Sequence, residues 1–425
     1  MSMCRSDELG LQASRQQRAK PMQGPIIIVG AGQAGVQVAD SLRQENYAGR
    51  ILLIGDETHL PYQRPPLSKD FLAGVVTEAQ LLLRTPDMLA RKNIELITNI
   101  RVNAVDRAAK TVALSDGRVL AYEGLALTTG CRARPLPMQG GAHEGVMTLR
   151  GIDDTRHIAK AMKAADNIVV IGGGFIGLEI AATARGFGKT VTVLEAGDRL
   201  MARAVSPVIS EYFRKHHESR GVRIRLGAKL VGIASHEDHV KAVETAEGEL
   251  IPADLVIVGI GIIPNTELAQ AAGLECEGGI VVDASSRTSD PSIVAAGDCT
   301  VRRENGRMLR LESVQNAVEQ GKSAAAALMG RDRPFTACPW FWSDQFDVKL
   351  QMAGLSAGYD QAVIRGSIDD GVFSAFYFRD GKLLGSDSVN QPREHMATRR
   401  MLDKNVSPTP EQTADLTFNF QTLLK

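Results

Sequence analysis

The sequence predicts an α/β protein in which one strand–turn–helix unit occurs twice, followed by a smaller α+β domain. Three observations lead to this prediction. Residues 25–35 and 168–177 each join a short apolar run to a Gly-x-Gly-x-x-Gly pattern. Two further apolar runs, at 125–130 and 255–261, also end in glycine, which is typical of buried strands that lead out of a domain. Beyond Pro334, several short runs and an Asp-Gly turn are typical of antiparallel strands.

The length of the chain sets the number of domains. A chain of 425 residues is too long for one hydrophobic core and indicates two or three domains. The two strand-to-glycine crossings divide it, since the first leads into a proline-containing segment at 132–137. We expect a disordered extension over 1–23, a discontinuous first domain over 24–131 and 256–334, a second domain over 132–255, and a C-terminal domain over 335–425.

Composition excludes several classes of protein. The formal net charge is zero, so there is no global electrostatic reason to bind nucleic acid or a membrane surface, and no apolar run reaches the length of a membrane span. The five cysteines contain no Cys-x-x-Cys pair, which argues against a redox-active disulfide and fits a reducing cytoplasm. We therefore expect a cytoplasmic protein without a metal site. The sequence leaves the oligomeric state open, as a monomer or a weak dimer.

The first unit has the features of a dinucleotide-binding fold. Gly30 permits the tight turn, Gly32 lets backbone amides approach a pyrophosphate, and Gly35 allows helix and strand to pack closely. The N-terminus of the following helix then offers unpaired N–H groups to the phosphates. Because the pattern occurs twice, we expect two dinucleotides, one held permanently and one exchangeable.

Asp56 follows the second apolar run of this unit. Its distance from Gly30 is near the roughly 20 residues typical of a carboxylate that binds ribose hydroxyls. The alternative is that Asp56 caps the next turn. We favour the ribose contact because of the glycine pattern upstream.

Two cations lie on the segment 62–70. Pro65 and Pro66 stiffen it, and we expect Ser68 to cap a short helix. Arg64 could neutralise a pyrophosphate and Lys69 a reduced cofactor anion. An ordinary solvated basic pair is the alternative.

The second unit repeats this pattern with Gly172, Gly174 and Gly177. Glu195 ends its second apolar run, and a carboxylate there accepts the ribose 2′-hydroxyl of NAD and repels the 2′-phosphate of NADP. The nearest following arginine is Arg199, four positions on. The unit therefore predicts NADH as the exchangeable dinucleotide.

Glu179 lies in the first turns of the helix of the second unit, where the first unit has the neutral Gln37. A carboxylate at this point could lie near the nicotinamide. It could equally be an acid placed favourably at a helix N-terminus.

Later segments add further candidates. The run 292–298 predicts a buried strand whose final Asp298 could bind sugar-alcohol hydroxyls, and 314–329 predicts a long helix. Residues 340–342 bring both tryptophans together. A basic helix near the C-terminus is either a solvated face or a docking site for an acidic partner.

Several of these motifs together resemble one family. The glycine turns, the Pro-Pro-Leu-Ser-Lys segment (65–69), Gly297-Asp298 and Trp-Phe-Trp-Ser-Asp-Gln (340–345) are similar to those of the FAD- and NADH-dependent ferredoxin reductases of bacterial oxygenase systems, the putidaredoxin reductase group among them. The resemblance extends from about Pro25 to the C-terminus. It implies a glutathione-reductase-like fold with two Rossmann-like domains. The chain has Thr128-Thr129-Gly130 where the family more often has Ala-Thr-Gly, and the N-terminal extension is unusual.

The resemblance also implies site residues. Lys69, Glu179 and Trp342 would be catalytic, with Lys69 near flavin N5 and paired with Glu179, and the buried indole of Trp342 beside the isoalloxazine. NADH would contact the second glycine turn, Glu179, Glu195 and Gly261. The residues implied at FAD are Gly30, Gly32, Ala34, Gly35, Asp56, Arg64, Lys69, Val102, Arg150, Asp298, Val314 and Trp342. Those implied in the second turn are Gly172, Gly174 and Gly177.

The implied electron acceptor is an acidic 2Fe–2S ferredoxin that feeds an oxygenase. We favour a cytochrome P-450 type monooxygenase as that oxygenase. A ring-hydroxylating dioxygenase and a rubredoxin system are the alternatives. The docking face for the ferredoxin would include Lys322, Arg331, Arg393 and Arg399. Three other functions are alternatives. A disulfide reductase needs a cysteine that faces the flavin, and an NADH oxidase or peroxide-reducing flavoenzyme usually has one there, but none occurs between Gly35 and Lys69. A strongly basic surface or a mitochondrial presequence would favour a redox-sensitive interaction protein like apoptosis-inducing factor, whereas the zero net charge and the polar N-terminus do not.

Overall fold

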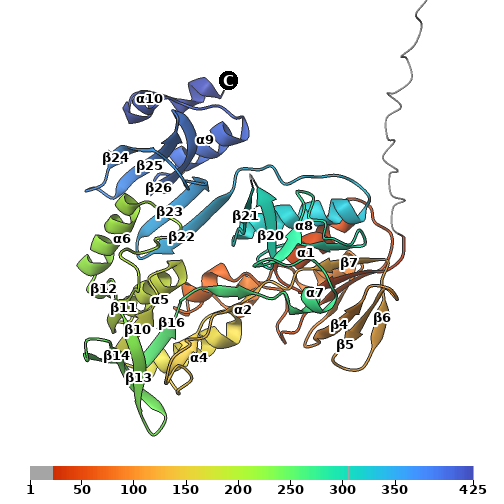
Figure 1. Ribbon diagram of the computed structural model, residues 1–425, viewed down its shortest axis with the longest axis horizontal. Coiled ribbons are helices and arrows are strands. Elements are labelled where there is room, and N and C mark those ends of the chain that lie inside the picture. Colours follow the sequence, from red (N-terminus) through yellow and green to blue (C-terminus); the bar gives the residue numbers. More distant parts are fainter. Residues whose placement is uncertain (1–22, 305, 425) are drawn as a thin grey trace, which may run out of the picture.

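The computed structural model describes residues 23–304 and 306–424. The predicted N-terminal extension therefore lies almost wholly outside the described residues, as does Cys4. Within them the chain builds three five-stranded sheets, two parallel and one antiparallel, each with its own helices, together with four smaller sheets (Figure 1).

The first parallel sheet has the strand order β19-β7-β1-β2-β3. Its central strands are fully buried, because apolar side chains project from both faces of each strand and are covered on both. The first strand in this order comes from far along the chain, as the run 292–298 predicted. The strands are β1 (Ile26–Val29), β2 (Ile51–Ile54), β3 (Ile94–Ile97), β7 (Gly124–Leu127) and β19 (Ile293–Ala295).

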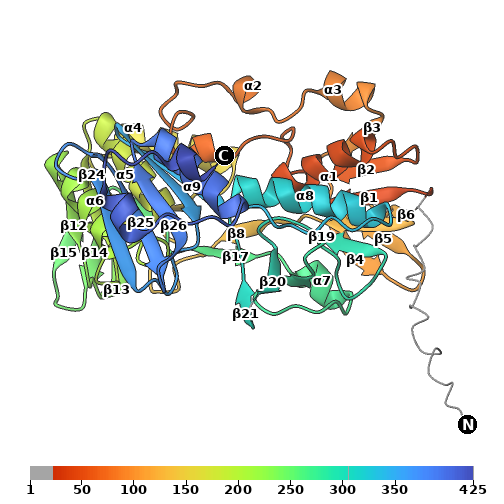
Figure 2. The same cartoon turned by 90° about the horizontal axis from the view of Figure 1, so that it is seen from above.

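Different elements cover the two faces of this sheet. Helices α1 (Gln33–Gln44) and α8 (Val314–Leu328) pack side by side on one face, and Figure 2 shows the two next to each other. The opposite face carries an antiparallel meander. Its strands are β4 (Val102–Asp106), β5 (Thr111–Leu114) and β6 (Val119–Ala121). A smaller three-stranded sheet lies beyond it, formed by β18 (Ile280–Val282), β20 (Thr300–Glu304) and β21 (Arg307–Leu309).

The second parallel sheet repeats the arrangement with the order β12-β11-β10-β16-β9. One of its faces carries helices and the other an antiparallel ribbon. The strands are β9 (Val146–Thr148), β10 (Asn167–Ile171), β11 (Thr190–Leu194), β12 (Val222–Arg225) and β16 (Leu255–Val258). The helices are α4 (Ile152–Ala164), α5 (Phe175–Gly186) and α6 (Pro207–Ser219). The ribbon is β13 (Leu230–His236), β14 (His239–Thr245) and β15 (Leu250–Pro252).

Two short strands cross between the parallel sheets. β8 (Cys131–Ala133) leaves the first sheet and β17 (Ile262–Pro264) returns to it, and the two pair with each other as an antiparallel bridge. The predicted boundary at residue 256 differs from this arrangement, because β16 pairs with β10 in the second sheet. The apolar run of β16 completes that sheet, so the crossing begins only after Val258.

The C-terminal part is an antiparallel sheet of order β22-β23-β26-β25-β24. Its edge strand β22 contains the Trp-Phe-Trp segment, which the sequence analysis did not identify as a strand. The strands are β22 (Trp340–Gln345), β23 (Val348–Gly354), β24 (Gln361–Ser367), β25 (Val372–Arg379) and β26 (Lys382–Val389). The helices that follow are α9 (Pro392–Asp403), α10 (Pro410–Ala414) and the 3₁₀ turn η2 (Phe420–Leu423).

One apolar cluster joins this antiparallel sheet to the second parallel sheet. Phe213 of α6, Val193 of β11 and Phe373 of β25 are all buried in it. The first parallel sheet instead has two clusters of its own, one on each face. The second sheet and the C-terminal sheet therefore share a core.

The remaining helices are short. They connect the sheets and include the segment that carries the two predicted cations. They are η1 (Pro65–Ser68), α2 (Glu78–Leu81), α3 (Pro86–Arg91) and α7 (Glu267–Ala271). No helix of residues 23–304 and 306–424 combines the length and the apolar character needed to cross a bilayer.

Candidate functional site

A single large cavity runs between the two glycine turns. Its volume is about 2280 Å³, and its wall comes from both parallel sheets, from η1 and from β22. A usual small-molecule pocket has roughly 300–1,000 Å³. The cavity is therefore large enough for two dinucleotides placed end to end or side by side.

Most residues expected at the site line this cavity. Gly35 and Gly177 do not, because each packs its helix against the preceding turn. The expected residues that do line it are Gly30, Gly32, Ala34, Asp56, Arg64, Lys69, Val102, Arg150, Gly172, Gly174, Glu179, Glu195, Gly261, Asp298, Val314 and Trp342.

The first glycine turn connects β1 to α1. Gly30 has φ +108°, and a Cβ there would overlap the carbonyl oxygen of Thr128. Gly35 has no room either, since its Cβ would overlap the carbonyl oxygen of Gly30. A Cβ on Gly32, by contrast, would meet nothing within 4 Å and would point into open space beside the cavity. The turn therefore requires glycine for two different reasons, backbone geometry and access for a ligand.

The second turn, between β10 and α5, has almost the same backbone. Gly172 has φ +106°, and a Cβ on Gly174 would again meet nothing within 4 Å. Glu195, at the end of β11, accepts N–H bonds from Gly173 at 2.6 Å and from Gly197 at 2.7 Å. Both carboxylate oxygens of Glu195 are thus fixed by backbone amides before any ligand arrives.

Arg199 is not positioned to bind a 2′-phosphate. One guanidinium nitrogen donates to the carbonyl of Val205 at 2.7 Å and to Oγ of Ser210 at 2.9 Å, and the other donates to the carbonyl of Ala202 at 2.6 Å. These contacts hold the side chain against the start of α6. The cation four positions after Glu195 therefore braces the loop.

Asp56 has a different environment from Glu195. Its carboxylate is more than half exposed and, within residues 23–304 and 306–424, pairs only with the exposed Arg101, at 3.1 Å. Because the pair lies in solvent, it contributes at most about 1 kcal/mol to stability. Asp56 lies at the cavity wall with a carboxylate free to accept further hydrogen bonds.

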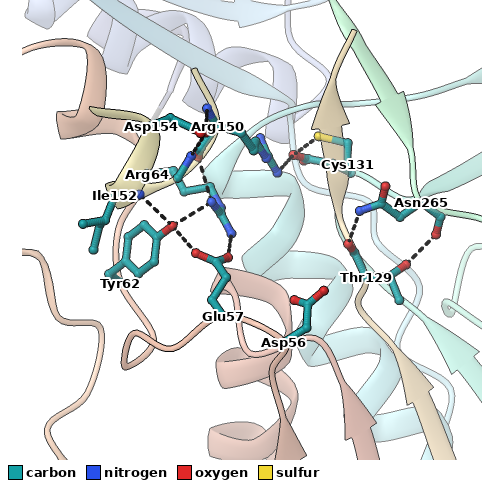
Figure 3. Close-up of polar contacts among 12 residues, drawn as sticks. Asp56, Glu57, Tyr62, Arg64, Thr129, Cys131, Arg150, Ile152, Asp154 and Asn265 are labelled. Carbon is teal, nitrogen blue, oxygen red and sulfur yellow. Dashed lines mark hydrogen bonds and ion pairs between the residues drawn. The ribbon is translucent and has the colours of Figure 1, made fainter. Parts of the chain in front are cut away.

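Arg64 belongs to a polar network beside the cavity (Figure 3). One of its nitrogens donates to the hydroxyl of Tyr62 at 2.9 Å and to the carbonyl of Arg150 at 2.8 Å, and the other donates to Oε1 of Glu57 at 2.5 Å. Tyr62 in turn donates to Glu57 at 2.5 Å. Burial opposes ionisation of Glu57, but Arg64 and Tyr62 hold the pKa of that carboxyl below its usual value. Arg64 is therefore a fixed cation at the wall of the cavity.

A second group in Figure 3 connects the crossing strand β8 to the end of β19. Asp298 accepts from the guanidinium of Arg150 at 3.3 Å and from the thiol of Cys131 at 3.4 Å. Burial, together with the nearby Asp298, raises the pKa of the Cys131 thiol. Cys131 lines the cavity but stays protonated, so it is a poor nucleophile for disulfide chemistry.

Lys69 and Glu179 meet where the two units come together. The ammonium nitrogen of Lys69 lies 3.2 Å from Oε1 of Glu179, the pairing that the family resemblance implied. Glu179 is 5% exposed, and burial raises the pKa of its carboxyl. Lys69 opposes that rise, as do hydroxyl donors from Ser68 at 2.5 Å and Ser343 at 2.7 Å. The helix-terminus role considered for Glu179 does not account for these contacts.

The prediction for Ser68 was wrong. Ser68 ends the 3₁₀ turn η1 instead of capping a helix, and its hydroxyl donates to Glu179 across the boundary between the two units. Pro65 and Pro66 start the turn, as their fixed φ favours, and the turn then directs both Ser68 and Lys69 toward α5.

Strand β22 closes this end of the cavity. Trp342 is half-buried, not buried as expected, and its ring lies 5.6 Å from that of Trp340. Phe341 points the other way and contacts Phe175, the first residue of α5, at 4.8 Å between ring centroids. Trp340, Phe341 and Trp342 all line the cavity, and Phe341 also contacts the second unit.

The cavity fits two dinucleotides on three independent observations. The open space at Gly32 and at Gly174 lies at a helix N-terminus in each unit, where a pyrophosphate binds. The buried Nε of Arg150 has no hydrogen-bond partner among the described residues. Its neighbour Asp298 can accept hydroxyl donors. These groups would hold the phosphates and the sugar alcohol of a bound FAD, and the second turn with Glu195 would hold NADH.

The expected docking cations have varied surroundings. Lys322 pairs with Glu319 at 2.6 Å, and Arg331 pairs with Glu45. Arg399 stacks over Trp340, with its guanidinium carbon 4.6 Å from the ring centroid, and Arg393 lies exposed six residues earlier on α9. Of these four cations, Arg399 is therefore the one that contacts the aromatic end of the cavity.

Sequence reasoning missed several site residues. Glu57 and Tyr62, which hold Arg64, carried no motif of their own. Ser343 and Gln345 were noticed only as part of a family segment, without a role. A buried serine carries little signal in the sequence, because its function depends on what the fold places opposite it.

Comparison with known proteins gives consistent results. The family model described as pyridine nucleotide-disulphide oxidoreductase matches residues 24–321, and the model described as reductase C-terminal matches residues 340–424. Rhodocoxin reductase of Rhodococcus erythropolis is 46% identical over 93% of this chain and 93% of that protein.

Two solved structures are also similar. The ferredoxin reductase for the CYP199A2 system from Rhodopseudomonas palustris is 46% identical with a TM-score of 0.92, and the match covers 94% of this chain and 100% of that one. The covalent putidaredoxin reductase–putidaredoxin complex is 42% identical with a TM-score of 0.91, and the match covers 94% of this chain and 98% of that one.

Proposed function

The chain belongs to the pyridine nucleotide-disulphide oxidoreductase family, and from this premise we propose that it is an FAD-dependent NADH:ferredoxin reductase. It takes a hydride from NADH and delivers electrons singly to a 2Fe–2S ferredoxin that serves an oxygenase. The chemistry supplied by bound FAD is this conversion of one two-electron step into two one-electron steps.

One observation carries the proposal. A buried Lys69–Glu179 pair lies between two glycine turns that open onto one cavity, and a half-buried tryptophan closes the same end. Cys131 at the cavity wall is protonated and belongs to no disulfide. The geometry therefore supports transfer between two stacked dinucleotides without a protein nucleophile.

The residues of this chain contribute position and charge. Lys69 supplies a positive charge beside the place where negative charge accumulates, and Glu179 keeps that ammonium group from turning away. Arg64, fixed by Glu57 and Tyr62, adds a second cation at the cavity wall. Because these groups are held by the fold, little reorganisation is needed when charge develops.

The choice of NADH follows from Glu195. Its carboxylate is held by two backbone N–H groups in the place where a 2′-phosphate would lie, and Arg199 is engaged elsewhere. A 2′-phosphate would therefore meet a fixed negative charge and no free arginine.

The partner docks at the aromatic end of the cavity, on α9. Arg399 stacks on Trp340, and Arg393 is exposed elsewhere on the same helix, so an acidic surface would find positive charge on α9. The similarity to the CYP199A2 reductase and to putidaredoxin reductase supports a cytochrome P-450 type oxygenase downstream. The cytoplasm is the proposed location, which the four unpaired cysteines of the described chain support.

The test is reduction of purified 2Fe–2S ferredoxins by the purified yellow protein, with NADH and NADPH run in parallel. We expect NADH to be at least about tenfold more efficient, which corresponds to about 1.4 kcal/mol of discrimination. We also expect coupled turnover to fall steeply with added salt. A colourless protein, or oxygen consumption that is equally fast without ferredoxin, would contradict the proposal.

A variant separates the role of Lys69 from general damage. Lys69→Ala removes the positive charge beside Glu179, so we expect flavin reduction by NADH to slow at least about tenfold or FAD content to fall. Lys382→Ala, an exposed lysine of β26, is the matched control and should behave as the parent. Unchanged stopped-flow reduction and FAD content in Lys69→Ala would remove Lys69 from the mechanism.

A further inference from the structure

A line of buried hydrogen bonds runs from α6 to the site carboxylate. His217 Nε2 lies 2.8 Å from Oε1 of Gln345, and Nε2 of Gln345 donates to Oγ of Ser343 at 3.1 Å. Ser343 then donates to Oε1 of Glu179 at 2.7 Å. Each of these four side chains is at most 5% exposed, so water does not interrupt the line.

All donors in the line point the same way. The amide oxygen of Gln345 can only accept, so His217 carries its proton on Nε2 and Gln345 directs its N–H toward Ser343. With its oxygen occupied as an acceptor, Ser343 has its own proton free for Glu179. Burial lowers the pKa of His217 to about 4, so the ring is neutral at pH 7 and has one donor. Its Nδ1 has no partner among the described residues, which fits a bare lone pair.

The strand that carries the line belongs to the C-terminal sheet. Ser343 and Gln345 are two positions apart on β22 and so face the same side, toward α5 and α6. Lys69 and Glu179 line the cavity, and this strand supplies Ser343, a hydroxyl donor to Glu179. A residue of the C-terminal sheet thus contacts the charged side chain of Glu179 on helix α5 of the second unit.

We propose that Ser343 and Gln345 are positioning residues that hold the Glu179 carboxylate ionised and aimed at Lys69. This rests on the proposed function, in which the Lys69–Glu179 pair acts beside the flavin. A protonated Glu179 would leave Lys69 without its counter-charge, and the ammonium group would turn toward Asp344, which lies 3.8 Å away. Loss of the donors therefore weakens the site without removing any group that touches the cofactor.

The charged and titratable groups around Glu179 are few. Lys69 follows η1, Asp344 is on β22 and His217 is on α6. Lys69 favours the ionised carboxylate, Asp344 disfavours it, and His217 is neutral. Hydrogen bonds to a charged group are worth enough that removing one should move the Glu179 midpoint upward by about one to two pH units.

The experiment titrates Glu179 directly. Infrared difference spectra of the flavin-loaded full chain are recorded against pH, and the carboxylic acid band absent from Glu179→Gln is assigned to Glu179. Ser343→Ala should raise the midpoint by about one to two pH units, and Gln345→Leu should raise it less, because Gln345 acts through Ser343. Ser343→Thr, which keeps the hydroxyl, should restore the parent midpoint.

Controls make the result unambiguous. Ser374, fully buried in β25, donates to Ser388 at 2.9 Å instead of to Glu179, so Ser374→Ala should titrate as the parent. If Ser343→Ala does not fold, Ser343→Cys keeps the shape with a weaker donor and should raise the midpoint less. Parent-like midpoints in Ser343→Ala and Gln345→Leu would overturn the proposal. Because the spectra read Glu179 and not turnover, this failure is distinct from a protein that reduces no ferredoxin.

Discussion

The turns Gly30–Gly35 and Gly172–Gly177 have nearly the same backbone, yet the helices that follow them are covered by different elements. Helix α1 packs against α8, and Gly321 of α8 leaves so little room that a Cβ there would lie 2.8 Å from Cβ of Gln37. Helix α5 is covered by β22, which places Ser343 against Glu179. Helix α1 is therefore covered by a helix of its own domain, whereas α5 is covered by a strand of the C-terminal sheet.

The acidic ends of the second strands differ as well. Glu195 is held by two backbone N–H groups, whereas Asp56 pairs only with an exposed arginine. The unit assigned to the exchangeable dinucleotide thus has its ribose-binding group fixed in advance. A glycine motif therefore defines where a pyrophosphate can lie, while the neighbours of the helix and of the second strand decide what the unit does with it.

The largest effect is expected at the part that the two units share. Gly30→Ala introduces a side chain at φ +108° that overlaps the carbonyl of Thr128, and the combined strain and overlap should destabilise the protein by about 2–6 kcal/mol. Thermal unfolding and flavin absorbance would show a lowered midpoint and lost cofactor. Gly32→Ala, whose Cβ meets nothing within 4 Å, should keep the parent midpoint. If both variants unfold alike, the turn is simply intolerant of any side chain.

A smaller effect should separate the two carboxylates. Glu195→Ala removes the fixed negative charge near the ribose, and we expect the preference for NADH over NADPH to fall about tenfold or more. Asp56→Ala should leave that preference unchanged, because Asp56 belongs to the other unit. The measurement is the ratio of kcat/KM for the two cofactors in each variant. Equal changes in both would show that the units are not specialised.

The smallest effect concerns pH. Burial raises the folded-state pKa of Glu179 above its ordinary value of 4.5, so the folded protein holds this proton more tightly than the unfolded chain does. The stability that this contributes is complete below about pH 4.5 and is lost as pH rises through the folded pKa. Glu179→Gln cannot titrate, so the difference between its thermal midpoint and that of the parent should shift in favour of the variant as pH rises. Gln37→Leu, the matched change in the neutral first unit, should show no such trend.

The parts of the fold that were predicted correctly are those that neighbouring residues specify. The runs ending at Gly30 and Gly172 contain strand, turn and helix within a dozen positions, so apolar periodicity and glycine spacing were enough. The same holds for the late strand that ends before Gly297, whose short apolar run carried a clear signal. Pairing of that strand with β7 confirmed that the chain returns to its first sheet.

The parts that were missed depend on contacts between distant segments. Ser343 and Glu179 are far apart in the chain, and nothing local to Ser343 indicates which helix its strand will cover. Strand β22 itself was hidden because its aromatic residues suggested a ligand contact more strongly than a strand. Ser68 was misassigned for the same reason, since its partner lies on another unit. Functional hydroxyls at such junctions become visible only once the domains are placed together.

The apolar cluster shared by the second parallel sheet and the C-terminal sheet has a practical consequence for building chimaeras from related reductases. If the C-terminal sheet alone were exchanged, Phe373 and α6 would come from different proteins, and their packed surfaces would no longer match. Grafts should instead move these two sheets as one block, with splice points at the crossing strands β8 and β17 and after α8.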